Sequence, residues 1–310
     1  MIGLIARRLL QLPLILLVIY TLTIVLAWAI PGSPLDKPEG RQPPEEVREA
    51  MKRQYNLDSL PRFYGSYLAS ATGVRWMADE VSGRAKRERE RATSGTKAPA
   101  RYVFDLGPSL MYEDWRVNEI VAASLPVSIT LGLGAVVIAT ILGVGAGVIG
   151  AARPASLADH ATLGLALVGI SVPSFVVGTT LALVFAVWLQ WFPLGGWGTL
   201  RQMALPMVTL SLPFAAYIAR LTRMGMMEHL QADYIRTARA KGAGEASVLL
   251  KHALKNAFLP VLSFLGPASA AAMTGSFVIE RVFFVPGIGQ HFVNAVLNKD
   301  LFLIMGVVLI

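Results

Sequence analysis

Long intervals without a charged side chain recur along the sequence, and they predict helices that cross a membrane. The uncharged runs are 9–30, 120–152, 161–200, 202–219, 256–279 and 301–310. An α-helix rises about 1.5 Å per residue, so roughly 20 apolar residues cross about 30 Å of hydrocarbon. Each of the first five runs is long enough for one span, although 202–219 is close to the lower limit. In the third run we expect a helix over about 163–189 and a loop over 191–197, where Trp and Gly suit the membrane interface.

The sixth run is too short for a complete span. Residues 301–310 form a helix of about 15 Å, which is half of a bilayer. We expect that the chain is truncated; the alternative is a final helix that ends inside a partner. The predicted fold class is therefore an all-α polytopic membrane protein with six spans, the sixth of them cut short.

Three regions follow from this pattern. Residues 1–30 form the N-terminal cytoplasmic end and the first transmembrane helix, 31–123 form an external region, and 124–310 form a transmembrane core that contains a polar loop, 220–256. Within the external region, the apolar spacing of Val47, Met51 and Tyr55 predicts a short amphipathic helix over 45–57. Such a helix packs against the spans or docks an external partner. The highly charged stretch 84–101 predicts a mobile insert.

Composition and charge support a membrane protein and exclude several other classes. The chain is 54% hydrophobic and 15% charged with a mean hydropathy of +0.55, whereas soluble domains carry about 25% charged residues. Without cysteine, it has no disulfide framework, zinc ribbon or thiol catalysis. If the N-terminus is cytoplasmic, ten Lys and Arg residues fall on the inside and only Arg201, Arg281 and Lys299 in short outside loops. The positive-inside rule therefore predicts this orientation, and the net charge of +8 does not indicate nucleic acid.

No motif for catalysis, nucleotide binding or metal binding survives inspection. The GxGxxG match at 145–150 lies inside an apolar run instead of between a strand and a helix, and no P-loop is present. Gly143 and Gly147 are better interpreted as small residues that let two helices approach closely. The four His residues are scattered, and no Asp, Glu, Lys or Arg lies within the five complete spans. An ion-coupled transporter needs such residues, so we expect energy to be supplied from outside the bilayer.

The polar loop 220–256 is the strongest candidate for that coupling. Met227, Leu230, Tyr234 and Ala238 recur at helical spacing, Gly242 and Gly244 interrupt the pattern, and 245–256 starts a second helix. Two short helices joined at a glycine corner would project from the membrane. On pattern alone, the loop is either a solvated basic segment that fixes orientation or a docking element for a cytoplasmic partner.

Two segments of this loop carry a family resemblance. Residues 234–242 (YIRTARAKG) and 251–260 (KHALKNAFLP) resemble the EAA loop of ABC importer permeases, in the variant of the peptide branch. The segments 31–34, 106–109, 117–118, 124–128, 275–276 and 286–290 also look like the B-type membrane subunit of an oligopeptide permease of the peptide/nickel family. The acidic residue of the EAA loop is absent near Arg236, and the insert 84–101 is longer than the pattern needs.

The resemblance implies a type I ABC importer transmembrane fold in a bacterial inner membrane. It implies a homologous second permease, two ATP-binding subunits that hold ATP and Mg, and an external peptide-binding protein, with no cofactor, metal or catalytic residue in this chain. Coupling to the ATPases would fall to Asp233, Tyr234, Arg236, Thr237, Ala238, Arg239, Ala240, Lys241 and Gly242. Pro173, Gly266 and Pro267 would either shape the substrate path or only kink helices for packing. Oligopeptides are the implied substrate, although dipeptide, nickel and glutathione importers have related subunits. The alternative is a stand-alone channel or secondary transporter for a small solute, and a further one is a membrane scaffold.

Overall fold

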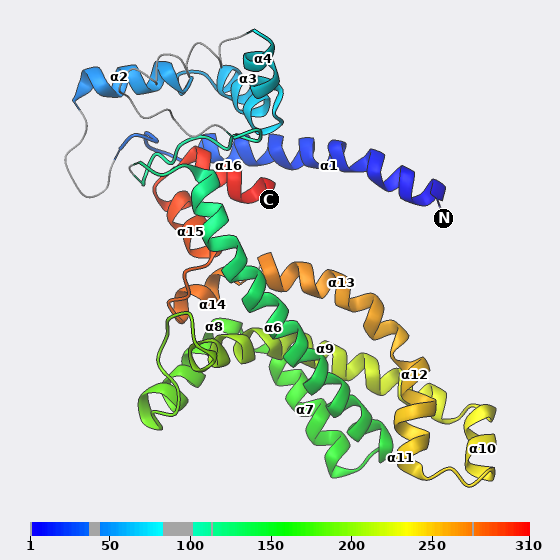
Figure 1. The fold of residues 1–310 in the computed structure, drawn as a ribbon. Helices are drawn as coiled ribbons and strands as arrows, with labels where there is room; N and C mark the ends of the chain where they lie inside the picture. The colour runs from blue at the N-terminus through cyan, green and yellow to red at the C-terminus, as the bar shows by residue number, and fades with distance from the viewer. Residues whose placement is uncertain (1, 37–43, 83–101, 113, 275) are drawn as a thin grey trace. The chain divides into compact units, whose positions relative to one another are not determined.

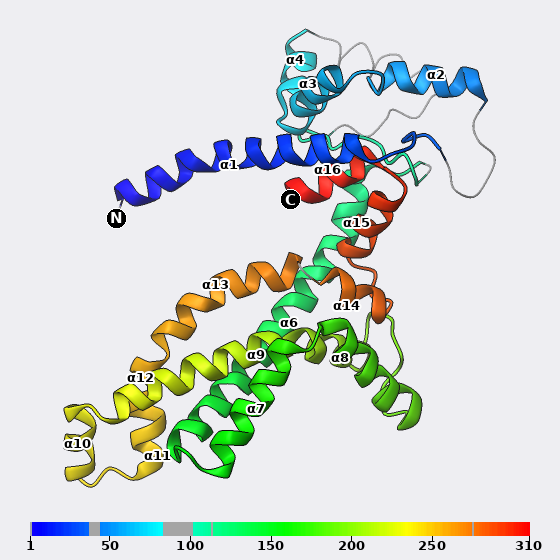
Figure 2. The same cartoon turned by 180° about the vertical axis from the view of Figure 1, so that it is seen from behind.

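A computed structural model describes residues 2–36, 44–82, 102–112, 114–274 and 276–310, and these residues form helices joined by turns and loops (Figures 1 and 2). Within these ranges no β-strand occurs, and the one β-bridge joins Pro108 to Arg116. The predicted insert 84–101 lies outside the described residues. The chain divides into two compact units, one formed by Met1–Ala123 with His291–Ile310 and the other by Ser124–Gln290.

The first unit contains one long apolar helix and several short ones. Its helices are α1 (Ile2–Ala29), α2 (Glu45–Gln54), α3 (Leu60–Ala71), α4 (Val74–Val81), the first turns of α6 (Val117–Ala152), most of α15 (Ile288–Leu297) and α16 (Leu301–Leu309). Aromatic rings form much of its core, with Phe63 and Phe302 5.3 Å apart in an edge contact and Tyr20 stacked on Tyr67. The predicted amphipathic helix 45–57 is confirmed as α2, which ends earlier, at Gln54.

Two consecutive residues fix the turn between α15 and α16. Lys299 donates hydrogen bonds to the carbonyl oxygens of Trp28, Ile30 and Gly32, where α1 ends. The fully buried carboxylate of Asp300 accepts hydrogen bonds from the Leu303 N–H at the start of α16, the Ser109 hydroxyl and the N–H groups of Leu110 and Met111. The cation therefore satisfies carbonyls where α1 ends, and the anion satisfies one N–H group at the N-terminus of α16 and two in the loop at 110–111.

The second unit contains the remaining helices. They are most of α6, α7 (Leu157–Ser171), α8 (Ser174–Leu181), the π-helix η1 (Ala182–Trp188), α9 (Leu200–Leu230), α10 (Asp233–Ala240), α11 (Glu245–Ser247), the π-helix η2 (Val248–Ala253), α12 (Leu254–Ala257), α13 (Leu259–Thr274) and α14 (Phe277–Val282). The close approach predicted at Gly143 and Gly147 is confirmed. A Cβ on Gly143 would lie 2.6 Å from the Ala215 oxygen, and one on Gly147 would lie 2.5 Å from Thr222 Cβ. Only glycine allows α6 and α9 to pack at this distance.

A buried carboxylate holds the loop after α14 in place. Glu280 on α14 accepts hydrogen bonds from the hydroxyls of Ser128 and Ser276 and from the N–H of Gly289. The Ser128 hydroxyl in turn accepts from the N–H of Ile288. Glu280 is fully buried and joins α14 and the start of α15 to α6.

The apolar helices agree with a membrane protein, with one correction. Four helices are long and apolar enough to cross a membrane, and the pair α7 and α8–η1 makes a fifth candidate that is bent by 108°. A single helix over 163–189 was therefore the wrong prediction. Pro173 lacks an N–H and disfavours helical geometry at the residue before it, and Val172 is accordingly extended, with φ −84° and ψ 127°. The predicted loop over 191–197 is confirmed.

Candidate functional site

Helix α10 stands at one end of the second unit, next to α11 and α12 (Figures 1 and 2). Ala232, in an extended conformation, precedes its first turn, so α9 and α10 are separate helices. The sequence predicted one helical face from Met227 to Ala238. This prediction is wrong, because Leu230 is the last residue of α9 and the face is divided between two helices. The expected second helix begins at Glu245, as predicted.

One apolar side chain attaches α10 to the rest of the unit. Ile235 is 0% exposed, and it joins a buried cluster that draws residues from α6, α9, η2 and α12: Ala151, Met226, Val248, Ala253 and Ala257. Ile235 is not among the residues predicted from the sequence. The sequence does contain a signal for its burial, because Ile235 is the only large aliphatic residue between Asp233 and Gly242. Burial of this side chain lets α10 move with the helices that it contacts.

The glycine corner after α10 has a specific geometry. Gly242 has a φ of +80°, its N–H donates to the Arg239 oxygen, and the N–H of Ala243 donates to the Ala238 oxygen. These two bonds form a Schellman motif, which ends a helix with a left-handed residue. No atom of the described residues would contact a Cβ at Gly242, so the positive φ, and not lack of space, accounts for glycine here.

An ion pair closes the corner. The Arg239 guanidinium donates from Nη2 to Glu245 Oε1 at 2.7 Å and from Nε to Oε2 at 3.2 Å. This bidentate pair lowers the pKa of the Glu245 carboxyl and raises the pKa of Arg239. Asp233 and Arg236 form a looser pair of 3.4 Å between two largely exposed side chains.

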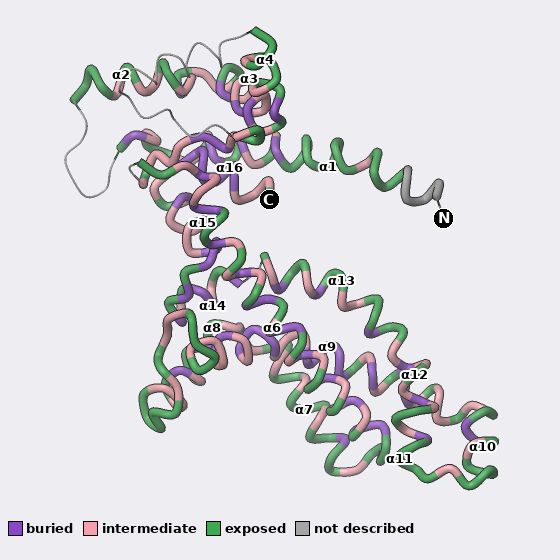
Figure 3. Tube along the Cα trace, viewed as in Figure 1, coloured by how far each residue is buried: buried purple, intermediate pink, exposed green. Residues whose placement is uncertain are grey.

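The residues predicted to couple to a partner all lie on α10 or directly after it. Eight of the nine are exposed and Ala238 is half-buried, so most of the surface of α10 is open to solvent (Figure 3). The Thr237 hydroxyl donates to the Asp233 oxygen within the helix. Tyr234 Oη accepts a hydrogen bond from Asn256 Nδ2 at 3.3 Å. The structure therefore brings together the two segments that carried the family resemblance.

The substrate-path candidates occupy different settings. Pro173 stands at the break between α7 and α8, whereas Gly266 and Pro267 lie within the continuous helix α13. All three are exposed in this chain. Helices α8 and α13 both pack against α9, but α8 also packs against α14 and α13 against α12.

One buried ion pair was not predicted from the sequence. Asp159, in the first turn of α7, is almost fully buried and accepts two hydrogen bonds from Arg223 on α9. Both residues lie in helices that qualify as candidate spans, but outside the charge-free runs from which those spans were predicted. A signal existed in Ser156 and Asp159, which have the spacing of a capping box before an apolar run. In the structure, Ser156 Oγ accepts from the Asp159 N–H.

Comparison with known proteins identifies the family. The model of a family described as the binding-protein-dependent transport system inner membrane component matches residues 139–310, more than half of the chain and all of α10. The chain belongs to this family. The permease is accordingly the transmembrane component of an ABC importer and a multi-pass protein of the inner membrane. A stand-alone channel or secondary transporter does not fit this family.

Relatives of known name cover nearly the whole permease. The oligopeptide transport system permease protein OppB of Salmonella typhimurium is 41% identical over 313 residues, which is 100% of this chain and 92% of the relative. The dipeptide transport system permease protein DppB of Bacillus subtilis is 40% identical over 292 residues, 94% of this chain and 84% of the relative. The corresponding protein of Lactococcus lactis is 35% identical over 311 residues, 100% of this chain and 92% of the relative.

Proposed function

We propose that this permease imports oligopeptides as one of two membrane subunits of an ABC transporter, and that α10 is the helix through which ATPase subunits drive it. The names of the relatives support a peptide substrate, oligopeptides for OppB at 41% identity and dipeptides for DppB at 40% identity. The observation that carries the proposal is the form of α10: a short, exposed, charged helix attached to four other helices through Ile235.

The partners and the orientation belong to the same proposal. A homologous second permease completes the pore, two ATP-binding subunits hold ATP and Mg, and an external peptide-binding protein delivers the substrate. The ten-to-three distribution of Lys and Arg supports a cytoplasmic N-terminus, which places α10 on the side of the ATPases.

The contacts of α10 suggest how ATP-driven motion reaches the membrane. Closure of the ATPase dimer displaces the exposed face of α10. Ile235 transfers that displacement to Met226 on α9 and Ala151 on α6, and the Arg223–Asp159 ion pair extends it to α7. Packed helices move as rigid bodies over such contacts, so α6, α7 and α9 rearrange together toward the outward-open state.

Coupling is tested in the assembled transporter. The epitope-tagged permease is purified from membranes together with its partners, and ATP hydrolysis is measured with and without peptide and binding protein. We expect peptide-stimulated hydrolysis for the native chain and its loss in Gly242→Pro, because proline cannot adopt a φ of +80°. A bulky residue at Ala238 should have the same effect. Normal stimulation in both variants would contradict the role of α10, and a permease that transports alone in liposomes would contradict the proposed function.

The orientation is tested by labelling. The chain contains no cysteine, so a single cysteine is a unique target. Thr237→Cys should react with an impermeant maleimide only from the cytoplasmic side, and Asp58→Cys, which is also exposed, only from the outside. The reverse pattern would overturn the proposed topology.

A further inference from the structure

Helix α4, in the first unit, exposes its apolar face. Val74, Met77 and Val81 follow one another at intervals of three and four residues, so their side chains share one face of the helix. They are 52%, 55% and 91% exposed. Phe104, which is 63% exposed, lies beside the start of the helix, because a Cβ on Gly73 would be 3.6 Å from its ring. Together these four exposed side chains form an apolar patch.

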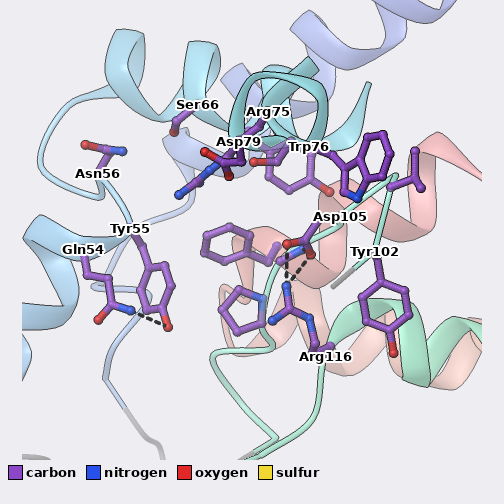
Figure 4. A pocket seen from close by; sticks show the side chains of 16 residues that line it. Gln54, Tyr55, Asn56, Ser66, Arg75, Trp76, Asp79, Tyr102, Asp105 and Arg116 are labelled. Carbon is purple, nitrogen blue, oxygen red and sulfur yellow. Dashed lines mark hydrogen bonds and ion pairs between the residues drawn. The ribbon is translucent and has the colours of Figure 1, made fainter. Parts of the chain in front are cut away.

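The polar side chains of α4 line a cavity of the same unit. Arg75 and Asp79, one turn apart, face this cavity of about 400 Å³ together with Trp76 (Figure 4). On a soluble domain a surface helix has the opposite arrangement, with its apolar stripe toward the core and its charged residues toward water. The reversed arrangement in α4 suits a helix whose outer neighbour is apolar.

Hydrogen bonds of the backbone hold the patch in a fixed place. Asn118 Nδ2 donates to the Phe104 oxygen at 2.7 Å, and the N–H of Asp105 donates to the Ser70 oxygen near the end of α3. The turn between α3 and α4 depends on Gly73, which has a φ of +79°. The patch is therefore a preformed surface, and a contiguous exposed apolar surface marks a contact with a protein or a membrane.

The contacts between α3 and α1 place the patch beside a membrane span. The Tyr20 hydroxyl donates to the Tyr64 oxygen at 2.5 Å, and the rings of Tyr20 and Tyr67 are stacked 6.2 Å apart. Tyr20 precedes Ala29, the end of the candidate span in α1, by nine residues, or about 14 Å of helix. This distance is close to half of the hydrocarbon layer. Helix α3 therefore lies beside the half of the span that ends at Ala29, and α4 begins two turns after Tyr67.

The surrounding residue types favour lipid over protein as the neighbour of the patch. Trp28 on α1, Tyr64 on α3 and Trp76 on α4 are half-buried, and Trp and Tyr are enriched where hydrocarbon meets headgroups. The patch itself offers no side-chain hydrogen-bond donor. Acyl chains need none, whereas protein interfaces carry about one hydrogen bond per 100–200 Å².

We propose that α4 and Phe104 insert this apolar patch into the membrane leaflet at which α1 ends, so that acyl chains contact Val74, Met77, Val81 and Phe104. Arg75 and Asp79 stay in the cavity on the other side of the helix. Interfacial helices of this kind bury their apolar face about 5–10 Å below the headgroups. The contact goes beyond the proposed function, because it assigns a lipid anchor to a region that has no part in coupling or transport.

Nitroxide labels on the full-length permease in phosphatidylcholine vesicles test the contact. The chain contains no cysteine, so Met77→Cys and Val81→Cys each provide one labelling site, and Asp58→Cys, exposed in the same unit, is the control in water. Oxygen concentrates among acyl chains and a nickel chelate concentrates in water. We expect the ratio of oxygen to nickel accessibility to be several-fold higher at 77 and 81 than at 58, and close to that of a phospholipid labelled on its acyl chain.

The labelled variants should fold normally, because both side chains are exposed; a native melting temperature in detergent checks this. High nickel accessibility at 77 and 81 would place the patch in water and overturn the proposal. Low accessibility to both reagents would show that protein covers the patch, and it would overturn the proposal as well.

Photo-cross-linking in the assembled transporter separates lipid from a partner subunit. A benzophenone attached to Val81→Cys should form adducts with phospholipid that mass spectrometry detects, and the same group on Asp58→Cys should not. A cross-link from position 81 to another protein would overturn the lipid contact and assign the patch to that protein. All labelled positions lie in the first unit, so neither result bears on the role of α10.

Discussion

Arg223 on α9 and Asp159 on α7 form a bidentate ion pair, with Nε to Oδ1 at 2.5 Å and Nη2 to Oδ2 at 2.8 Å. The two residues are 64 positions apart in the sequence. The Asp159 carboxylate also accepts from the N–H of Ala155, so one side chain completes the turn before α7 and joins that helix to α9. The pair lies in the same part of the unit as the cluster around Ile235, because α9 contributes both Arg223 and Met226.

Breaking this pair should destabilise the permease. Asp159→Asn removes the charge that Arg223 faces while keeping the size of the side chain, so we expect a clear fall in melting temperature in detergent. The matched control is Asp233→Asn, because Asp233 is exposed and its pair with Arg236 is long; that variant should be close to native. A double-mutant cycle with Arg223→Gln should give a coupling energy well above zero, and additive effects would contradict the importance of the pair.

Removing the apolar anchor should loosen α10. Ile235→Ala deletes a fully buried side chain and leaves a cavity, which costs about 2–4 kcal/mol at well-packed sites. We expect faster hydrogen exchange across α10 and a lower ratio of transport to ATP hydrolysis. Ala240→Ser, at an exposed position of the same helix, is the control for the hydrogen-exchange measurement. Native exchange rates in Ile235→Ala would show that α10 is attached by other contacts.

The two glycines of the corner should respond differently to the same substitution. Gly242→Ala forces a side chain into a left-handed conformation, at a cost of about 1 kcal/mol, and weakens the Schellman turn. Gly244 has a φ of −64° and open space around its Cα, so Gly244→Ala should be neutral. Peptide-stimulated ATP hydrolysis in the assembled transporter is the measurement. Equal effects of the two substitutions would contradict the geometric explanation.

The ion pair between Arg239 and Glu245 should make the corner sensitive to acid. Because Arg239 lowers the pKa of Glu245 in the folded chain, the pair contributes stability above the ordinary carboxyl pKa, and this contribution is lost as pH falls through the lowered value. Both side chains are exposed to solvent, so the effect is local and small. We expect hydrogen exchange at residues 239–245 to increase below about pH 4 in the native chain. In Glu245→Gln this acid-dependent increase should be absent; its persistence would assign the effect to another group.

Hydrophobic patterning predicted the spans because a bilayer imposes one length on every crossing helix. It located helix ends poorly, because charge-free intervals mark where polar side chains begin, not where a helix stops. Helix α9 continues past Arg220 and Arg223 to Leu230 for this reason. A kink at Pro173 was one of the two interpretations that the sequence offered. The angle of 108° depends on packing against α9 and α14, and rules based on local sequence do not describe that packing.

The exposed residues of the candidate site were predicted from the sequence, whereas the buried residues that hold its helices together were not. The motif identified the charged residues of α10 because they are exposed, and exposed polar patterns can be recognised from sequence alone. Ile235, Asp159 and Glu280 act through contacts with residues far away in the chain, so their importance depends on tertiary structure.

The hydrogen bonds from Lys299 to the carbonyls at the end of α1 have a consequence for biosynthesis. Helix α1 leaves the ribosome before every other described helix, yet the ammonium that satisfies its last carbonyls is synthesised 267 residues after Gly32. Until then those carbonyls depend on water and lipid headgroups. The earliest of these helices to enter the membrane is therefore among the last to be fixed, and a ribosome that stalls before residue 299 would hold a nascent chain in which this end of α1 is uncapped.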